Sequence, residues 1–307
     1  MTDSSFAQRR NAGQADIPEE NTLESLLSAL RSGADFIETD AIATADGEIV
    51  LAHSNDPSMH IFPPLEGIPG KRYIDEMTLA EVQSLHIGSS GQGRIPTLRE
   101  LLRAIAAEFQ GSGTILNLEL KGIQATPRAT APPLSGPVLE TIRQEGFPLE
   151  RVLFSSFSVR TLEELTALEP AARTGLLFYT APPGSSYADT VLFEDGSEFY
   201  IPFHKPNIEA ALRRLPKLEA LIPEIQDLTP DTVELAARNR LAILTYGYPE
   251  ESPLKSRTFA EAAKQAVRLC RQHDVKLGLI TDFIADMGQL IRQEMPKAPG
   301  GPGVQPP

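Results

Sequence analysis

The sequence contains a single cysteine, Cys270, among its 307 residues, so an intramolecular disulfide bond is excluded. It also lacks any apolar run of about 18 residues, the length that a transmembrane helix requires. The segment from Met1 to Arg10 has no apolar core of the kind found in secretory signals. These absences predict a cytoplasmic protein without stable membrane insertion.

Positive charge is scarce as well. The chain has 28 Lys and Arg against 41 Asp and Glu, which gives a formal net charge of −13. Such a surface repels nucleic acid and anionic lipid headgroups, so we expect neither as a partner. A small phosphate-bearing substrate remains compatible with this charge, because a bound cation can reverse its sign locally. The composition leaves the oligomeric state open.

The remaining composition, 41% hydrophobic and 22% charged, is ordinary for a globular protein. The length suits one (β/α)8 barrel or two smaller domains. Helical periodicity predicts helices over residues 20–33, 79–85, 98–109, 137–145, 159–168, 229–239 and 259–273. Strands are predicted over residues 35–43, 48–53, 114–121, 151–154, 175–179, 241–246 and 276–281.

Alternating strands and helices favour a parallel sheet with helices outside it, as a doubly wound sheet or a closed barrel. In the first predicted helix, Asn21 and Glu24 resemble a capping box, and Gly33 stands where a C-cap glycine belongs. We predict one barrel domain over residues 1–295. Residues 296–307 are rich in Pro and Gly and are predicted to be a disordered tail.

Two carboxylates lie two residues apart in the first strong strand, at Glu38 and Asp40. Residues at this spacing point to the same face of a strand. If that face is exposed, the pair is simply solvated. The flanking residues are mostly apolar, however, and two buried ionised carboxylates require a cation, which favours a metal or catalytic role.

Asn117, Glu119 and Lys121 alternate with leucines in a later strand. This pattern fits an antiparallel strand with one wet face, or a barrel strand whose polar side chains face the interior near the mouth. In a barrel, Glu119 would join Glu38 and Asp40 in a site of hard oxygen ligands suited to Mg²⁺ or Ca²⁺. Lys121 would then serve as a counter-charge for phosphate.

His53 ends the predicted strand over residues 48–53. A histidine at a strand end is often only a surface residue, but strand ends are also where barrel enzymes carry their chemistry. The remaining histidines have no such context and are predicted to be structural or surface residues. They are His60, His86, His204 and His273.

Seven short features, in this order and spacing, resemble the glycerophosphodiester phosphodiesterase family, from about residue 7 to residue 290. They are Pro18–Thr22, Ile37–Asp40, Val50–His53, Met77–Glu81 followed by Ile95–Leu98, Leu118–Lys121, Ser155–Ser158 and Ile280–Asp282. The resemblance implies a single TIM barrel, a divalent cation, and hydrolysis of a small-molecule phosphodiester by paired histidines.

The resemblance also implies roles for particular residues. Glu38, Asp40 and Glu119 would hold the cation. Arg9 and Lys121 would bind phosphate oxygens, with Arg9 able to bind two at once.

The chain departs from the family pattern at the catalytic histidines. Gln8 stands where the first histidine is expected, and glutamine cannot exchange a proton near neutral pH. Arg10 replaces a glycine. Ser54 replaces the expected Asp after His53, with Asp56 two residues further on.

A tryptophan common near the seventh strand end is also missing. Leu244–Tyr246 occupies that stretch, and the chain contains no Trp. Together the departures affect the expected acid–base chemistry and leave the pattern of the fold and the metal site in place.

Two functions are compatible with these observations. The first is a metal-dependent phosphodiester hydrolase, or an enzyme of a related phosphoryl transfer, in which His53 alone moves protons and Gln8 only hydrogen-bonds phosphate. The second is a catalytically impaired relative that binds a phosphorylated ligand or a protein partner.

Overall fold

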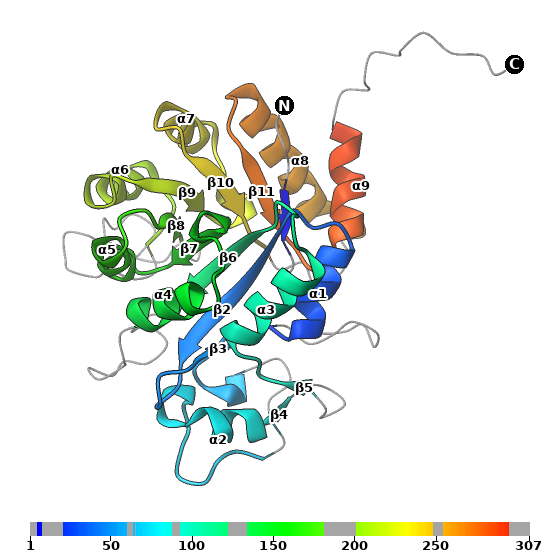
Figure 1. Ribbon diagram of the computed structural model, residues 1–307. Coiled ribbons are helices and arrows are strands. Elements are labelled where there is room, and N and C mark those ends of the chain that lie inside the picture. The colour runs from blue at the N-terminus through cyan, green and yellow to red at the C-terminus, as the bar shows by residue number, and fades with distance from the viewer. Residues whose placement is uncertain are drawn as a thin grey trace, which may run out of the picture.

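The computed structural model describes residues 5–7, 21–59, 64, 66–87, 93–121, 134–180, 201–247 and 254–294. Within these residues, eight parallel strands form the centre of the molecule (Figure 1). They are β1 (Ser5–Ala7), β2 (Phe36–Ala43), β6 (Ile115–Leu120), β7 (Val152–Ser156), β8 (Arg173–Leu177), β9 (Leu218–Ile222), β10 (Ala242–Thr245) and β11 (Leu277–Ile280).

The strands follow the order β1-β11-β10-β9-β8-β7-β6-β2 in the sheet. Strands β1 and β2, at the two ends of this series, also lie against each other. A short strand, β3 (Ile49–Leu51), pairs antiparallel with β2. The TIM barrel expected from the sequence is therefore confirmed.

Helices surround the sheet (Figure 1). They are α1 (Leu23–Arg31), α3 (Leu98–Glu108), α4 (Ser135–Gln144), α5 (Val159–Leu168), α6 (Lys205–Arg214), α7 (Pro230–Arg238), α8 (Arg257–Gln272) and α9 (Ile284–Glu294). Among the described residues, no helix is both long and apolar enough to cross a membrane.

The segment between β3 and α3, here called the β3–α3 insert, carries smaller elements beside the barrel. They are η1 (Pro57–Met59), η2 (Ile74–Glu76), α2 (Leu79–Ser84) and the hairpin of β4 (His86–Ile87) with β5 (Gly93–Arg94). Two further 3-10 turns precede β7 and follow β9. They are η4 (Leu149–Arg151) and η5 (Ile225–Asp227).

The apolar pattern of each helix explains how it packs. In α3, Leu98, Leu101, Leu102 and Ile105 recur at helical spacing and all four are buried against the sheet. Thr97 caps this helix by accepting a hydrogen bond from the backbone N–H of Glu100. The two largest apolar cores lie between the sheet and the helices. A separate apolar cluster that includes Phe36, Leu153 and Ile222 lies inside the barrel.

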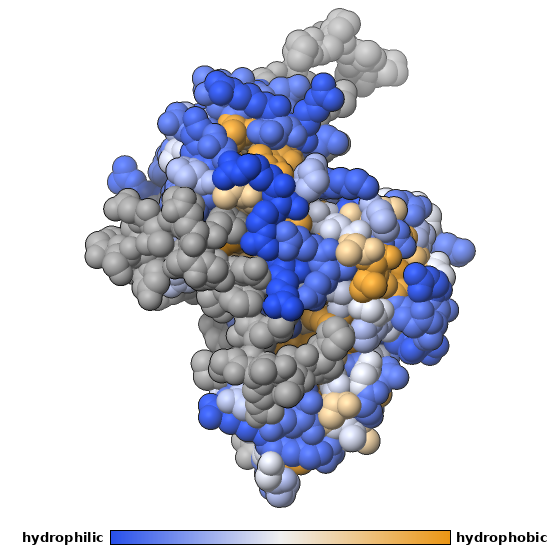
Figure 2. Space-filling model, turned by 90° about the vertical axis from the view of Figure 1, so that its left-hand side faces the viewer, coloured by the Kyte–Doolittle hydropathy of each residue, from blue (hydrophilic) through white to orange (hydrophobic). Residues whose placement is uncertain are grey.

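The surface view in Figure 2 is largely hydrophilic, with apolar residues exposed only in small separate areas. Among the described residues, the large hydrophobic side chains that are exposed are Leu168, Tyr179 and Leu254. They belong to different parts of the chain, as scattered exposed apolar residues usually do.

Several sequence predictions require correction. The N-cap of α1 is Thr22, which accepts from Ser25 N, and Asn21 instead has a left-handed φ of 55°. The strand that precedes His53 is β3, which is not one of the barrel strands. The sequence patterns did not predict β1, β9, α6 or α9. The predicted tail over residues 296–307 lies outside the described residues.

The β3–α3 insert yields a prediction about pH. Hydrogen bonds from Lys71 and from the backbone and side chain of Thr78 lower the pKa of Glu81 from 4.5 to about 2. Because the folded pKa is depressed, Glu81 stabilises the fold above pH 4.5, and this stabilisation is lost as the pH falls toward 2.

Glu81→Gln should therefore lower the melting temperature at neutral pH, and the difference from wild type should shrink below pH 4.5. Melting curves from pH 7 downward measure this. Glu66→Gln, which changes an exposed carboxylate of the same insert, is the matched control. If the difference in melting temperature between wild type and Glu81→Gln stayed constant below pH 4.5, the lowered pKa of Glu81 would be contradicted.

Candidate active site

The three carboxylates predicted as metal ligands come together at the carboxyl ends of two neighbouring strands. Asp40 on β2 and Glu119 on β6 are register partners, and Glu38 precedes Asp40 by two residues on the same face of β2. Each of the three offers an oxygen within 4.8 Å of the others. Their exposed fractions are 5% for Glu38, 0% for Asp40 and 2% for Glu119. The predicted convergence is thus confirmed, while their role as ligands remains a prediction.

Lys121 lies within this carboxylate cluster of Glu38, Asp40 and Glu119. Its Nζ is 2.9 Å from Asp40 Oδ1 and 2.7 Å from Glu119 Oε1. When all four groups are ionised, three negative charges and one positive charge leave a formal excess of two negative charges. Buried carboxylate oxygens gathered in this way are the hard ligands that a divalent cation takes.

Asn21 orients Asp40. Its Nδ2 donates to Asp40 Oδ2 at 3.0 Å, while its Oδ1 accepts from the backbone N–H of Asp40 at 3.1 Å and from the Thr39 hydroxyl. Asparagine tolerates the left-handed backbone that this position requires better than most residues do. The sequence pattern predicted that Asn21 caps a helix. The family resemblance of Pro18–Thr22 was the only other sequence feature that included Asn21.

A buried hydroxyl beside the cluster also fits a bound cation. Ser155 on β7 is the register partner of Glu119 and is completely buried. Its Oγ has no hydrogen-bond partner among the described residues. The neighbouring Ser156 is different, because its hydroxyl donates to Leu120 O at 2.9 Å. A buried polar group without a partner is normally satisfied by a water or an ion that the site holds.

His53 reaches this end of the barrel through a hairpin. Strand β3 runs back along β2, and the backbone N–H of Ala52 donates to Asp40 O at 3.0 Å. His53 follows directly and is half-buried. This backbone contact places residue 53 near Asp40 by the antiparallel return of β3 rather than at the end of a barrel strand, and the catalytic role of His53 stays a prediction.

Asp56 does not replace the missing carboxylate after His53. It makes an ion pair with Arg72 at 2.7 Å and accepts from the Ser58 backbone N–H and hydroxyl. Burial raises the pKa of Asp56, but the hydrogen bonds from Ser58 and Arg72 outweigh it and lower the pKa overall. Asp56 is therefore a structural anion of the β3–α3 insert.

The stretch where the family carries a tryptophan contributes a tyrosine. Tyr246 follows β10, is buried, and donates its hydroxyl to Phe178 O at 2.7 Å. Its ring meets the edge of Phe157 with centroids 6.5 Å apart. Both aromatic residues follow barrel strands, so they contribute apolar packing at the same end of the barrel as the carboxylate cluster.

The other sequence candidates have different outcomes. Gln8, Arg9 and Arg10 lie outside the described residues, as does His60. His86 is exposed, and His204 and His273 are half-buried at helix ends, as expected for structural or surface residues.

The contacts of Asn21 predict a measurable supporting role. Asn21→Ala removes the groups that fix the Asp40 carboxylate, and the loss of such a supporting residue typically weakens metal binding roughly 10–100-fold. Calorimetric titration with Ca²⁺ or Mg²⁺ measures the affinity. Thr97→Ala, which removes a helix cap that makes no contact with the cluster, is the control. Equal cation affinity in wild type and Asn21→Ala would contradict the role.

Fold and site together define a TIM-barrel protein with a buried acidic centre at the carboxyl ends of its strands. The model of the glycerophosphoryl diester phosphodiesterase family matches residues 11–286. The chain therefore belongs to this family.

Individual relatives agree with this family. A glycerophosphodiester phosphodiesterase of Caldanaerobacter subterraneus is 29% identical over 170 residues, which cover 53% of this chain and 62% of that protein. One of Bacillus altitudinis is 30% identical over 159 residues, covering 52% and 60%. The alignments thus span about three fifths of these relatives' lengths.

A solved structure shows the same fold. The Oleispira antarctica phosphodiesterase, described in complex with the product sn-glycerol-3-phosphate, superposes with a TM-score of 0.64. It is 22% identical to this chain, and the match covers 95% of this chain and 97% of that one.

Proposed function

We propose that the protein is a divalent-cation-dependent hydrolase of glycerophosphodiesters. The observation that carries the proposal is the buried cluster of Glu38, Asp40 and Glu119 with Lys121 inside it, at the barrel end where such enzymes act. Family membership and the sn-glycerol-3-phosphate bound by the Oleispira antarctica relative support a glycerol phosphate product.

In this proposal Glu38, Asp40 and Glu119 hold Mg²⁺ or Ca²⁺. A cation held there would supply Lewis-acid chemistry toward a phosphoryl oxygen. Lys121, already paired with two carboxylates, contributes positive charge on the substrate side of the cluster. Asn21 keeps the Asp40 carboxylate in a fixed orientation. These residues bind and orient the phosphodiester without transferring a proton.

Proton transfer is assigned to His53, the histidine next to the cluster. It exchanges a proton with the attacking or the leaving oxygen. Arg9 is proposed to bind two phosphate oxygens at once, and Gln8 to hydrogen-bond a third. Because glutamine cannot relay a proton, hydrolysis would depend on His53 alone.

A second candidate function follows from Gln8, which stands in the sequence where the family has its first histidine. Losing one acid–base group typically costs roughly 10²–10⁴-fold in rate. The protein would then bind a glycerophosphodiester or another phosphorylated ligand with negligible turnover.

One experiment separates the two functions. Wild type and His53→Ala are incubated with glycerophosphocholine and Ca²⁺, Mg²⁺ or Mn²⁺, and glycerol 3-phosphate release is measured beside calorimetric binding. A hydrolase should release product, and His53→Ala should be slower by roughly 10²–10⁴-fold while still binding substrate. Binding without turnover in wild type would support the second function, and neither binding nor turnover would refute both hydrolysis and binding of this glycerophosphodiester.

A further inference from the structure

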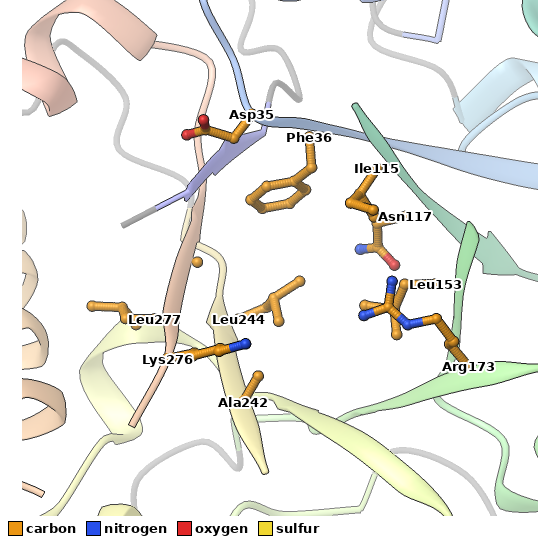
Figure 3. Close-up of a pocket in the computed structure, with 11 residues that line it drawn as sticks. Asp35, Phe36, Ile115, Asn117, Leu153, Arg173, Ala242, Leu244, Lys276 and Leu277 are labelled. Carbon is orange, nitrogen blue, oxygen red and sulfur yellow. The ribbon is translucent and has the colours of Figure 1, made fainter. Parts of the chain in front are cut away.

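A cavity of about 320 Å³ lies at the amino-terminal ends of the barrel strands, at the end opposite the carboxylate cluster. Its lining includes Phe36, Ile115 and Ala242, which are the first residues of β2, β6 and β10 (Figure 3). Its volume is at the lower end of the range, about 300–1,000 Å³, of cavities that hold small ligands.

The inner wall of this amino-terminal cavity is apolar. Phe36 and Leu153 are each only 4% exposed, and Leu244 also lines the space (Figure 3). Gly278 adds to the wall without a side chain. A Cβ at that position would lie 3.1 Å from Leu244 Cγ and 3.3 Å from a Phe36 ring carbon. A side chain at this position would therefore crowd Leu244 and Phe36, so the glycine lets these two apolar side chains lie close to the β11 backbone.

One buried polar side chain points into the cavity. Asn117 is 1% exposed, and its amide lies within the lining near Arg173 (Figure 3). Neither its Nδ2 nor its Oδ1 has a hydrogen-bond partner within the described part of the chain. Proteins normally satisfy a buried amide with a protein, water or ligand atom. Asn117 thus marks where a polar group of an occupant would be received.

Basic side chains stand around the opening. Arg173 uses Nε for Glu219 and Nη1 for Glu150 O, and its Nη2 donates to no residue that the structure describes. Lys276 is exposed and makes no ion pair with the described residues, and its ammonium reaches over the cavity (Figure 3). One carboxylate, Asp35, lies on the opposite rim.

A second hollow of about 600 Å³ adjoins the opening and extends the basic rim. It shares Arg173, Ala242 and Lys276 with the cavity and adds Arg240 and His273. Glu219 and Asp274 are the acids of this hollow. The two linings together hold as many acids as Lys and Arg residues. The case for an anionic head therefore rests on Lys276, which makes no ion pair with a described residue, and on the open Nη2 of Arg173.

We propose that the amino-terminal cavity binds an amphiphilic anion, namely a short aliphatic chain that carries a carboxylate or phosphate head. The aliphatic part lies against Phe36, Leu153 and Leu244, where it is removed from water. The head lies at the rim, within reach of Lys276 and of the open donor of Arg173. A neutral apolar molecule would leave these cations unused, and inorganic phosphate would leave the apolar wall uncovered.

Calorimetry on the full chain with saturating Ca²⁺ tests this proposal with four probes below their micellar concentrations. Decanoate and decyl phosphate carry both a chain and an anionic head. Decanol lacks the charge, and inorganic phosphate lacks the chain. We expect decanoate, decyl phosphate or both to bind clearly more tightly than decanol and inorganic phosphate, and the preferred head identifies the source as a carboxylate or a phosphate.

Two variants assign the binding to this cavity. Lys276→Glu, at an exposed position, should weaken binding by roughly tenfold or more because a charge-assisted contact is lost and a repulsive one gained. Ala242→Phe should fill the space and abolish binding, with melting curves to verify its fold. Lys205→Ala, which removes an exposed lysine at the start of α6, is the control and should bind as wild type does.

Three outcomes would overturn the proposal. The first is that no amphiphile binds, which would mean that the cavity holds only water. The second is that decanol or inorganic phosphate binds as well as the amphiphiles do. The third is binding that Lys276→Glu and a folded Ala242→Phe leave unchanged, which for decyl phosphate would indicate the carboxylate-cluster end instead.

Discussion

Changing Glu38, Asp40 and Glu119 together to Ala should abolish the rise in melting temperature that Ca²⁺ or Mg²⁺ gives the wild-type protein. A ligand that binds only the folded state stabilises it by about 2.7 kcal/mol when its concentration is 100 times its dissociation constant. The three buried carboxylates provide the hard oxygen ligands for this binding. Without added cation, the variant loses the repulsion among the carboxylates but also the two carboxylate partners of Lys121, so the comparison is made on the cation-dependent rise alone.

Asp40→Asn is the sharper form of this test because it keeps the shape of the side chain and removes its charge. Asp40 is fully buried and contacts Lys121 and Asn21. Asp40→Asn should therefore weaken cation binding more than Asn21→Ala does. Glu140→Gln, on the exposed face of α4, is the matched control. A cation-dependent rise that survives in both cluster variants would place the metal elsewhere.

Changing Gln8 to His should raise the rate of glycerophosphodiester hydrolysis by roughly 10²–10⁴-fold, the usual contribution of one acid–base group. The gain should be in kcat rather than KM, because in the proposed site the imidazole would act in the transition state, whereas Gln8 would already offer a hydrogen bond to phosphate. Steady-state kinetics on wild type and Gln8→His measures kcat and KM.

The resemblance predicts a glycine at the position of Arg10, so the double change with Arg10→Gly is the fairer comparison. Gln8→Asn, which keeps an amide but offers no proton exchange, should give no gain. Wild-type turnover already near about 10 s⁻¹, a typical enzyme value, would show that Gln8 does not limit the chemistry.

The carboxylate cluster could be predicted from sequence because alternation along a strand fixes which side chains share a face. Glu38 and Asp40 had to point the same way, and Glu119 followed in a second strand with the same alternation. What the pattern could not supply is the pairing of β2 with β6, since it depends on contacts between residues far apart in the chain.

Asn21 and β9 show why other features were missed. Asn21 followed by Glu24 fits a capping box, but the tertiary contact with Asp40 takes the Asn21 side chain and leaves Thr22 to cap the helix. Strand β9 has the sequence LEALI, whose leucines and alanine fit a helix as well as a strand. Its burial within the sheet decides the outcome, and propensity alone does not.

The amino-terminal cavity could not be predicted either. Its lining comes from the starts of several strands that are far apart in the sequence. Sequence alternation shows that Asn117 shares a face with Glu119, but not that its amide lacks a partner. That fact follows only from the packing of the neighbouring strands.

The most direct test of the central claim is the cation dependence of glycerophosphocholine hydrolysis, measured as glycerol 3-phosphate released by wild type and by Asp40→Asn. Both proteins are assayed after chelation and again after Ca²⁺ or Mg²⁺ is restored. We predict that wild-type hydrolysis disappears with the chelator and returns with the cation, and that Asp40→Asn shows none in either condition. Hydrolysis that persists in the chelator and is equal in Asp40→Asn would contradict the account.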